Sequence, residues 1–163
     1  MKFSRPGKES GINVKVNNLE DEAVIDKLYE ASPAGVPVRL MVRSICCIHP
    51  SVPGLSDRIA LYRVVGRYLE HSRVFLFHQN GALALYMGST DWMRRNLRHR
   101  VEVVFPVLDH QIKEEVLAFL DIQFRPAKKT QLLGIDLRPV SWPQAPKQYC
   151  SQEEFYQFLA EKK

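Results

Sequence analysis

Cysteine is scarce in this sequence, and its spacing argues against a disulfide-stapled or zinc-binding protein. The chain has three cysteines in 163 residues. Cys46 and Cys47 are neighbours, and Cys150 lies far along the chain. Neighbouring cysteines rarely bridge to each other and no CxxC pair is present, so neither a disulfide framework nor a zinc site is predicted. We therefore expect a reducing, cytoplasmic setting.

Long apolar runs are also absent. No stretch approaches the ~18 consecutive apolar residues of a membrane-spanning helix. The first ten residues are polar and basic, so we expect no signal peptide. No internal repeat or low-complexity tract divides the chain. We predict a disordered lead-in over residues 1–11 and a single α/β domain over 12–163.

What is present is an ordinary globular composition with a basic excess. Apolar content of 45% and charged content of 25% are typical of a soluble domain. The net charge of +5 weakly favours a polyanionic partner, such as a nucleotide, a nucleic acid or an anionic polymer. Much of this charge falls in one short stretch, hereafter the arginine cluster: Arg94, Arg95, Arg98, His99 and Arg100.

The first half of the sequence predicts a strand–helix–strand unit. Apolar residues alternate over 12–16, recur at helical spacing over 20–31 after a capping Asn18, and dominate a second strand over 36–43. Such units place the two strands parallel and buried by the helix. Ligands of open α/β sheets bind beyond the carboxyl ends of strands, where Arg43 lies.

A hairpin is predicted in the middle of the chain. Asn80 and Gly81 separate the apolar runs 74–77 and 82–86. Asn-Gly between apolar runs is the strongest short-range hairpin signal, because a type I′ turn needs positive φ at both central residues.

The hairpin register brings candidate site residues together. With Asn-Gly at the turn, Arg73 pairs across from Gly88, and His71 from Thr90. Since Gly88 has no side chain, we expect room beside Arg73 for a ligand. A histidine, an arginine and a Gly-Ser turn completed by Ser89 suit a phosphate site.

The remaining patterns complete a mixed α/β order. After the second strand they predict a loop over 44–57, a lead-in to the hairpin over 59–66, a short helical segment over 91–100, a strand over 101–105 stopped by Pro106, a helix capped by Asp109, a looser stretch, and a last short helix over 151–159.

Several stretches, taken in order, resemble one family. They are Val42-Arg43-Ser44-Ile45-Cys46-Cys47, Pro53-Gly54-Leu55-Ser56, Gly66-Arg67-Tyr68-Leu69-Glu70-His71-Ser72-Arg73, Gly88-Ser89-Thr90-Asp91-Trp92-Met93, Arg95-Asn96-Leu97 with Arg100-Val101-Glu102, and Ser151-Gln152-Glu153-Glu154. From about residue 12 onward the chain resembles the carboxyl-terminal part of bacterial polyphosphate kinases of the phospholipase-D-like type. It departs at Ser44, where the family usually has glycine, and at His49.

The resemblance implies a fold and a function. The fold is a phospholipase-D-like mixed sheet flanked by helices. The full enzyme reversibly transfers the terminal phosphate of ATP to polyphosphate through a phosphohistidine, and this chain resembles the second of its two phospholipase-D-like halves. The phosphorylated histidine belongs to the preceding half. The implied partners are ATP or ADP, polyphosphate and the upstream domains, in a homo-oligomer, with no nucleic acid.

The same resemblance implies cofactor and location. Magnesium accompanies ATP and is held mainly by the phosphates and the upstream domains, with no metal site in this chain. The full enzyme is cytoplasmic or membrane-associated.

The resemblance also assigns site residues. His71 and Arg43 line the nucleotide phosphate site, and Arg100 approaches the phosphates. Arginine suits this task because it stays charged and forks onto two phosphate oxygens, and a histidine exchanges protons near neutral pH. We assign His71 as the proton donor or acceptor and the two arginines as phosphate clamps. Further phosphate-binding candidates are Arg73, Ser89 and Asn96.

Two other functions and one structural alternative stay open. Arg73 stands where phospholipase-D-like motifs carry lysine, and His78 stands where they carry aspartate, which argues against phosphodiesterase chemistry in this half alone. A dimeric phosphodiesterase or nuclease is one alternative. A non-catalytic polyanion-binding module using the arginine cluster is another. Arg73 could also form an ion pair with Glu70 instead of contacting phosphate.

Overall fold

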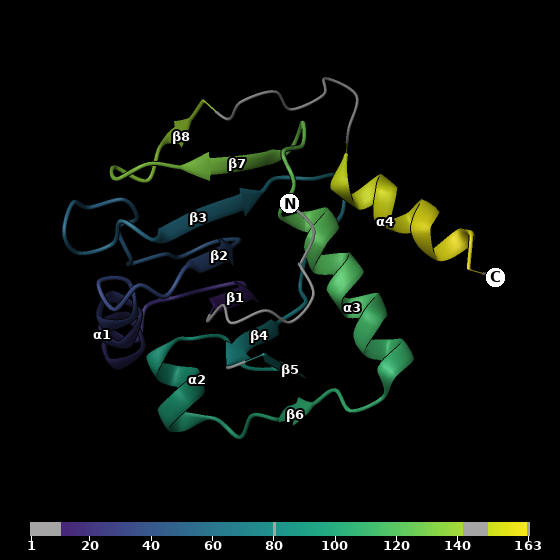
Figure 1. Cartoon of the computed structure of the whole chain (residues 1–163), viewed down its shortest axis with the longest axis horizontal. Helices are drawn as coiled ribbons and strands as arrows, with labels where there is room; N and C mark the ends of the chain where they lie inside the picture. Colours follow the sequence, from purple (N-terminus) through teal and green to yellow (C-terminus); the bar gives the residue numbers. More distant parts are fainter. Residues whose placement is uncertain (1–10, 80, 142–149, 163) are drawn as a thin grey trace.

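A mixed sheet runs through the part of the chain that the computed structural model describes, residues 11–79, 81–141 and 150–162. Its eight strands follow the order β6-β5-β4-β1-β2-β3-β7-β8 (Figure 1). The strands are β1 (Gly11–Val16), β2 (Val38–Val42), β3 (Ile59–Val64), β4 (Val74–Gln79), β5 (Ala82–Gly88), β6 (Val104–Pro106), β7 (Thr130–Leu133) and β8 (Pro139–Val140). The helices are α1 (Glu22–Ala31), α2 (Arg94–His99), α3 (His110–Gln123) and α4 (Ser151–Ala160).

Helices cover both faces of the sheet. In Figure 1, α1 and α2 lie on one side and α3 and α4 on the other. Because successive strand residues point to opposite faces, Leu40 packs with Leu28 of α1, whereas Met41 packs with Leu120 of α3 and with Phe124, which follows that helix. The predicted mixed α/β class is confirmed.

The predicted strand–helix–strand unit is confirmed, but its cap is not Asn18. Strands β1 and β2 pair in parallel, and β3 continues the parallel set. The helix begins two residues later than expected, because Asp21 caps it by accepting a hydrogen bond from the Val24 backbone N–H at 3.2 Å. This is the N-cap to N3 bond that such a carboxylate makes. Asn18 instead bonds to Asp91 from its side chain.

The hairpin register is also confirmed. Val74 pairs with Met87 and Gln79 with Ala82, which leaves a two-residue turn. Gly81 has φ of 83°, whereas Asn80 lies outside the described residues. Beyond the ladder, the Gly88 N–H donates to the Arg73 carbonyl at 3.4 Å.

The expected room beside Gly88 is not there. A Cβ on Gly88 would lie 2.3 Å from the Val103 carbonyl oxygen and 3.0 Å from Val104 Cγ2. The glycine is needed because the neighbouring chain approaches closely. The expectation of a ligand space at this position is therefore wrong.

The last strands differ most from the sequence expectation. The strand expected over 101–105 is shorter and shifted, as β6, and includes Pro106, which is tolerated because β6 is an edge strand. Strands β7 and β8 form where only loose structure was predicted, with β7 antiparallel to β3. Helix α4 begins at Ser151 without a side-chain cap.

Two further expectations concern the first residues of the chain and membrane-spanning helices. The lead-in expected over 1–11 lies outside the described residues, except for Gly11, which begins β1 and is buried. Among the described helices, none combines the length and the apolar character needed to cross a bilayer.

The close approach at Gly88 predicts a sensitive position. Gly88→Ala should lower the free energy of unfolding by about 1–3 kcal/mol, because the new methyl group overlaps the Val103 carbonyl. Gly11→Ala is the matched control, since its Cβ would meet only ordinary contacts at 3.8 Å, and it should change stability by less than about 0.5 kcal/mol. Urea unfolding checks both. Equal stability of the two variants would contradict the prediction.

Candidate functional site

The candidate residues gather at one edge of the sheet. The parallel strands β1 and β2 end there, and β4, antiparallel to β1, begins there. Backbone hydrogen bonds join the residues that follow β1 and β2. The Arg43 N–H donates to the Val16 carbonyl at 3.3 Å, and the Ser44 N–H donates to the Asn17 carbonyl at 2.8 Å. This edge is the expected location for ligands of an open α/β sheet.

His71 is held by the side chain of Arg73. Arg73 Nη1 donates to His71 Nδ1 at 2.8 Å and to the His71 carbonyl at 2.9 Å. A guanidinium only donates, so Nδ1 acts as the acceptor and the neutral ring carries its proton on Nε2. His71 is exposed, so its Nε2–H is open to a ligand or to solvent.

Arg73 is in turn fixed by Asp91. Its Nε and Nη2 each donate to one Asp91 carboxylate oxygen, both at 3.2 Å, and the two side chains are 13% and 5% exposed. The alternative ion pair of Arg73 with Glu70 is therefore wrong. Most of the Arg73 donors are thus engaged by Asp91 and His71.

Asp91 remains ionised despite its burial. It also accepts hydrogen bonds from the Asn17 backbone N–H at 2.7 Å and from Asn18 Nδ2 at 3.0 Å. Burial raises the pKa of Asp91, but the hydrogen bonds from Arg73, Asn17 and Asn18 outweigh it and hold the pKa below its ordinary value.

Ser89 and Asn96 both bind Glu102, which was not selected as a candidate from the sequence. Ser89 Oγ donates to Glu102 Oε2, and Asn96 Nδ2 donates to Oε1 at 2.5 Å. The hydrogen bonds from Ser89 and Asn96, together with the charges of Arg100 and Arg73, lower the pKa of Glu102. A lone carboxylate among valines at 101–104 was the sequence signal for it.

Arg43 has a buried donor with no partner in the part of the chain that the structure describes. It follows β2 directly, is half-buried, and its Nε makes no hydrogen bond to any described residue. Buried polar atoms are nearly always paired, so an orphaned guanidinium nitrogen suits an external anion. Ser72 Oγ and Arg63 Nε, close to the same edge, are also buried and have no hydrogen-bond partner within the described ranges. Arg63 was not selected from the sequence, because the stretch 59–66 was predicted only as a lead-in to the hairpin, whereas the structure places Arg63 in β3.

A buried ion pair lies beneath this edge. Lys15 Nζ is 3.1 Å from Glu70 Oε2, and the Lys15 side chain is 3% exposed. Burial lowers the pKa of Lys15, the Glu70 carboxylate raises it, and the charge of Arg43 lowers it further. Arg43 therefore lies close to the buried Lys15–Glu70 pair.

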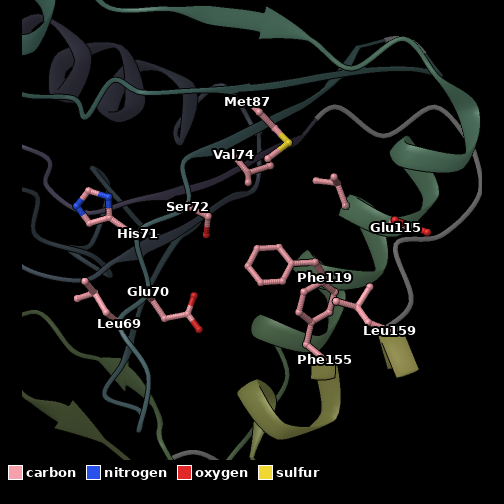
Figure 2. A pocket seen from close by; sticks show the side chains of 11 residues that line it. Leu69, Glu70, His71, Ser72, Val74, Met87, Glu115, Phe119, Phe155 and Leu159 are labelled. Atoms are coloured by element: carbon pink, nitrogen blue, oxygen red, sulfur yellow. The ribbon is translucent and has the colours of Figure 1, made fainter. Parts of the chain in front are cut away.

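An apolar pocket of about 510 Å³ adjoins the His71 segment. Figure 2 shows the His71 ring turned away from Phe119 and Phe155, which line the opposite side of the pocket. The pocket therefore shares Glu70, His71 and Ser72 with the edge described above.

Arg100 ends α2 and is exposed. No hydrogen bond or ion pair joins it to a described residue, although its charge and that of Arg73 both act on Glu102. Arg98 is partly engaged by Asp21, at 3.4 Å. The structure thus brings Arg100 toward Glu102 and leaves its guanidinium facing outward.

These side chains do not make a magnesium site. Within the described ranges, no group of three or more His, Cys, Asp or Glu side chains could hold a metal ion. The site carboxylates Asp91 and Glu102 already accept hydrogen bonds from arginine, serine and asparagine side chains.

The fold and this edge define a mixed α/β domain that presents histidine and arginine where its parallel strands end. Residues 1–151 match the family model described as "Polyphosphate kinase C-terminal domain 2". The chain belongs to this polyphosphate kinase family.

Individual polyphosphate kinases resemble this chain in sequence and in structure. The chain is 43% identical to polyphosphate kinase of Escherichia coli K12 over 134 residues, 82% of this chain and 20% of that protein. It is 48% identical to polyphosphate kinase of Bacillus anthracis over 120 residues, which are 74% of this chain and 17% of that protein. The crystal structure of polyphosphate kinase from Porphyromonas gingivalis superposes with a TM-score of 0.88 at 38% identity, covering 96% of this chain and 24% of that one. This chain therefore spans about a fifth of its curated relatives.

The Arg73–Asp91 pair predicts a pH-dependent stability. Asp91→Asn should lower the free energy of unfolding by about 3 kcal/mol at neutral pH, because it leaves Arg73 buried without its counter-ion. The folded-state pKa of Asp91 is lowered, so the unfolded state binds more protons in acid. The contribution is full above the unfolded pKa of about 4 and is lost as pH falls through the folded value.

Urea unfolding of both proteins between pH 7 and pH 2 checks this. The stability difference should shrink as the pH falls. Asp26→Asn, at an exposed position on α1, is the control and should show no such trend. A difference of constant size across the whole range would contradict the assignment.

Proposed function

We propose that this chain supplies the nucleotide- and polyphosphate-binding half of a polyphosphate kinase active site. The full enzyme would transfer the terminal phosphoryl group of ATP to polyphosphate, reversibly, through a phosphohistidine on an upstream part. Family membership and the printed names of the relatives support this. The upstream part is invoked because the chain corresponds to about a fifth of those relatives.

One observation carries the proposal. The buried Nε of Arg43 has no partner among the described residues, and it lies where parallel strands end, near the cation Lys15. The Nε atom itself is covered, so a phosphate oxygen would reach it after a shift of the half-buried Arg43 side chain and would then satisfy the donor and neutralise the guanidinium charge. The same edge carries the outward Nε2–H of His71.

Each residue has a distinct part in this proposal. Phosphoryl transfer depends on positioned cations that stabilise charge on the phosphoryl oxygens. Arg43 and Arg100 would do this, and His71 would donate its Nε2 proton to the oxygen that leaves, or recover it in the reverse direction. Arg73 would hold the ring of His71, with Asp91 as its counter-ion. Ser89 and Asn96 would act through Glu102 rather than directly.

Magnesium would arrive bound to the nucleotide phosphates, and this chain's residues take no part in holding it. We propose a cytoplasmic or membrane-associated homo-oligomer as the setting of the full enzyme. The arginine cluster on and beside α2 would extend the phosphate site toward the polymer.

The phosphate site predicts a position-specific loss of binding. Arg43→Ala should weaken tripolyphosphate binding about tenfold or more, since a charge-assisted hydrogen bond contributes about 1.5–3 kcal/mol. Arg58→Ala is the matched control, because Arg58 is an exposed arginine at the amino end of β3, the opposite edge of the sheet. Calorimetric titration at one fixed salt concentration checks this. If both variants lost the same affinity for tripolyphosphate, the loss would reflect net charge alone and would contradict a defined site at Arg43.

The missing partner predicts reconstitution. With labelled ATP, the chain alone should form no stable phosphoenzyme, whereas mixing it with the upstream region of the Escherichia coli relative should restore transfer to polyphosphate. His71→Ala should abolish the restored transfer by at least about 10²-fold, while His110→Ala, an exposed histidine on α3, should not.

Other outcomes identify the other functions. Hydrolysis of bis-nitrophenyl phosphate by the isolated chain would favour a dimeric phosphodiesterase. Tight, salt-sensitive polyphosphate binding with no transfer in any mixture would favour a polyanion-binding module.

A further inference from the structure

The segment that carries His71 is held by a side chain from the far end of the chain. Gln152, at the start of α4, is buried. Its Oε1 accepts from the Tyr68 N–H at 3.0 Å, and its Nε2 donates to the Tyr68 carbonyl at 2.8 Å and to Glu70 Oε1 at 2.8 Å. Both amide hydrogens are used, so the carboxamide replaces a neighbouring strand for this irregular stretch.

Glu70 adds a second anchor immediately before His71. One carboxylate oxygen pairs with Lys15 of β1, and the other accepts from Gln152 and, at 3.4 Å, from Gln123 of α3. Figure 2 shows Glu70 directed toward Phe119 while the His71 ring points the other way. Fixing the inward direction of Glu70 therefore fixes the outward direction of its neighbour.

Gly66 shows how closely Gln152 approaches this segment. A Cβ at position 66 would lie 2.2 Å from Gln152 Oε1 and 2.5 Å from its Cδ. The segment begins with glycine at the point where the carboxamide inserts. Gln152 contacts both the start of the segment and the residue next to His71.

We infer that Gln152 is a positioning residue for His71. It acts through Tyr68 and Glu70, and it makes the geometry of the phosphate site depend on the docking of α4. A glutamate at this position would lack both donors and would set a second carboxylate against Glu70. The role assigned to His71 rests on the proposed function, whereas the restraint on its segment does not.

The test combines two readouts on the whole chain. Gln152→Ala should weaken tripolyphosphate binding at least about fivefold. Without phosphate, it should also shift or broaden the ring-nitrogen NMR signals of His71, which report whether Nδ1 still accepts from Arg73. Gln157→Ala, an exposed glutamine on the same helix, is the control and should change neither. His71→Gln identifies the ring signals.

A second variant keeps the inference testable if Gln152→Ala does not fold. Gly66→Ala keeps the Gln152 side chain but displaces it, and should give the same His71 signature. Lower stability in urea with unaltered His71 signals, in either variant, would overturn the inference and leave Gln152 a structural residue. If the unmodified chain fails to bind tripolyphosphate, the proposed function falls, while the phosphate-free His71 signals still decide the inference.

Discussion

The buried ion pair between Arg73 and Asp91 is the interaction on which the site depends. It joins the start of β4 to the turn after β5, and Asp91 extends it to Asn17 and Asn18 after β1. The same guanidinium holds His71 Nδ1. A single charge pair thus links the sheet edge to the imidazole. Because both side chains are largely buried, removing either one would leave the other as an unpaired buried charge.

Around this pair, the site divides into restrained and unsatisfied groups. Arg73, Ser89 and Asn96 are engaged by Asp91 and Glu102, whereas Arg43 keeps a buried donor without a partner among the described residues. The engaged residues hold the site side chains in place, and the unpaired donor of Arg43 is the group suited to bind an anion. This division suits phosphoryl transfer, in which preorganised charge is more important than covalent participation by the protein.

Local patterns were sufficient where the interaction itself is local. The hairpin register follows from a two-residue turn, and the placement of Arg43 follows from the parallel strand–helix–strand unit. Glu102 was missed because its partners become apparent only when α2 folds back. The cap of α1 was misplaced because Asn18 is recruited by Asp91, seventy-three positions away in sequence.

Sequence patterns were enough to predict the class of fold, the family and the edge of the sheet where the candidate residues meet. These depend on periodicity, turn chemistry and ordered motifs, which are short-range properties. The folded packing was needed to show that Gly88 admits a neighbouring backbone and not a ligand. It alone placed Gln152 beneath the His71 segment. Such contacts join segments distant in sequence, and their geometry depends on the packing of the whole domain.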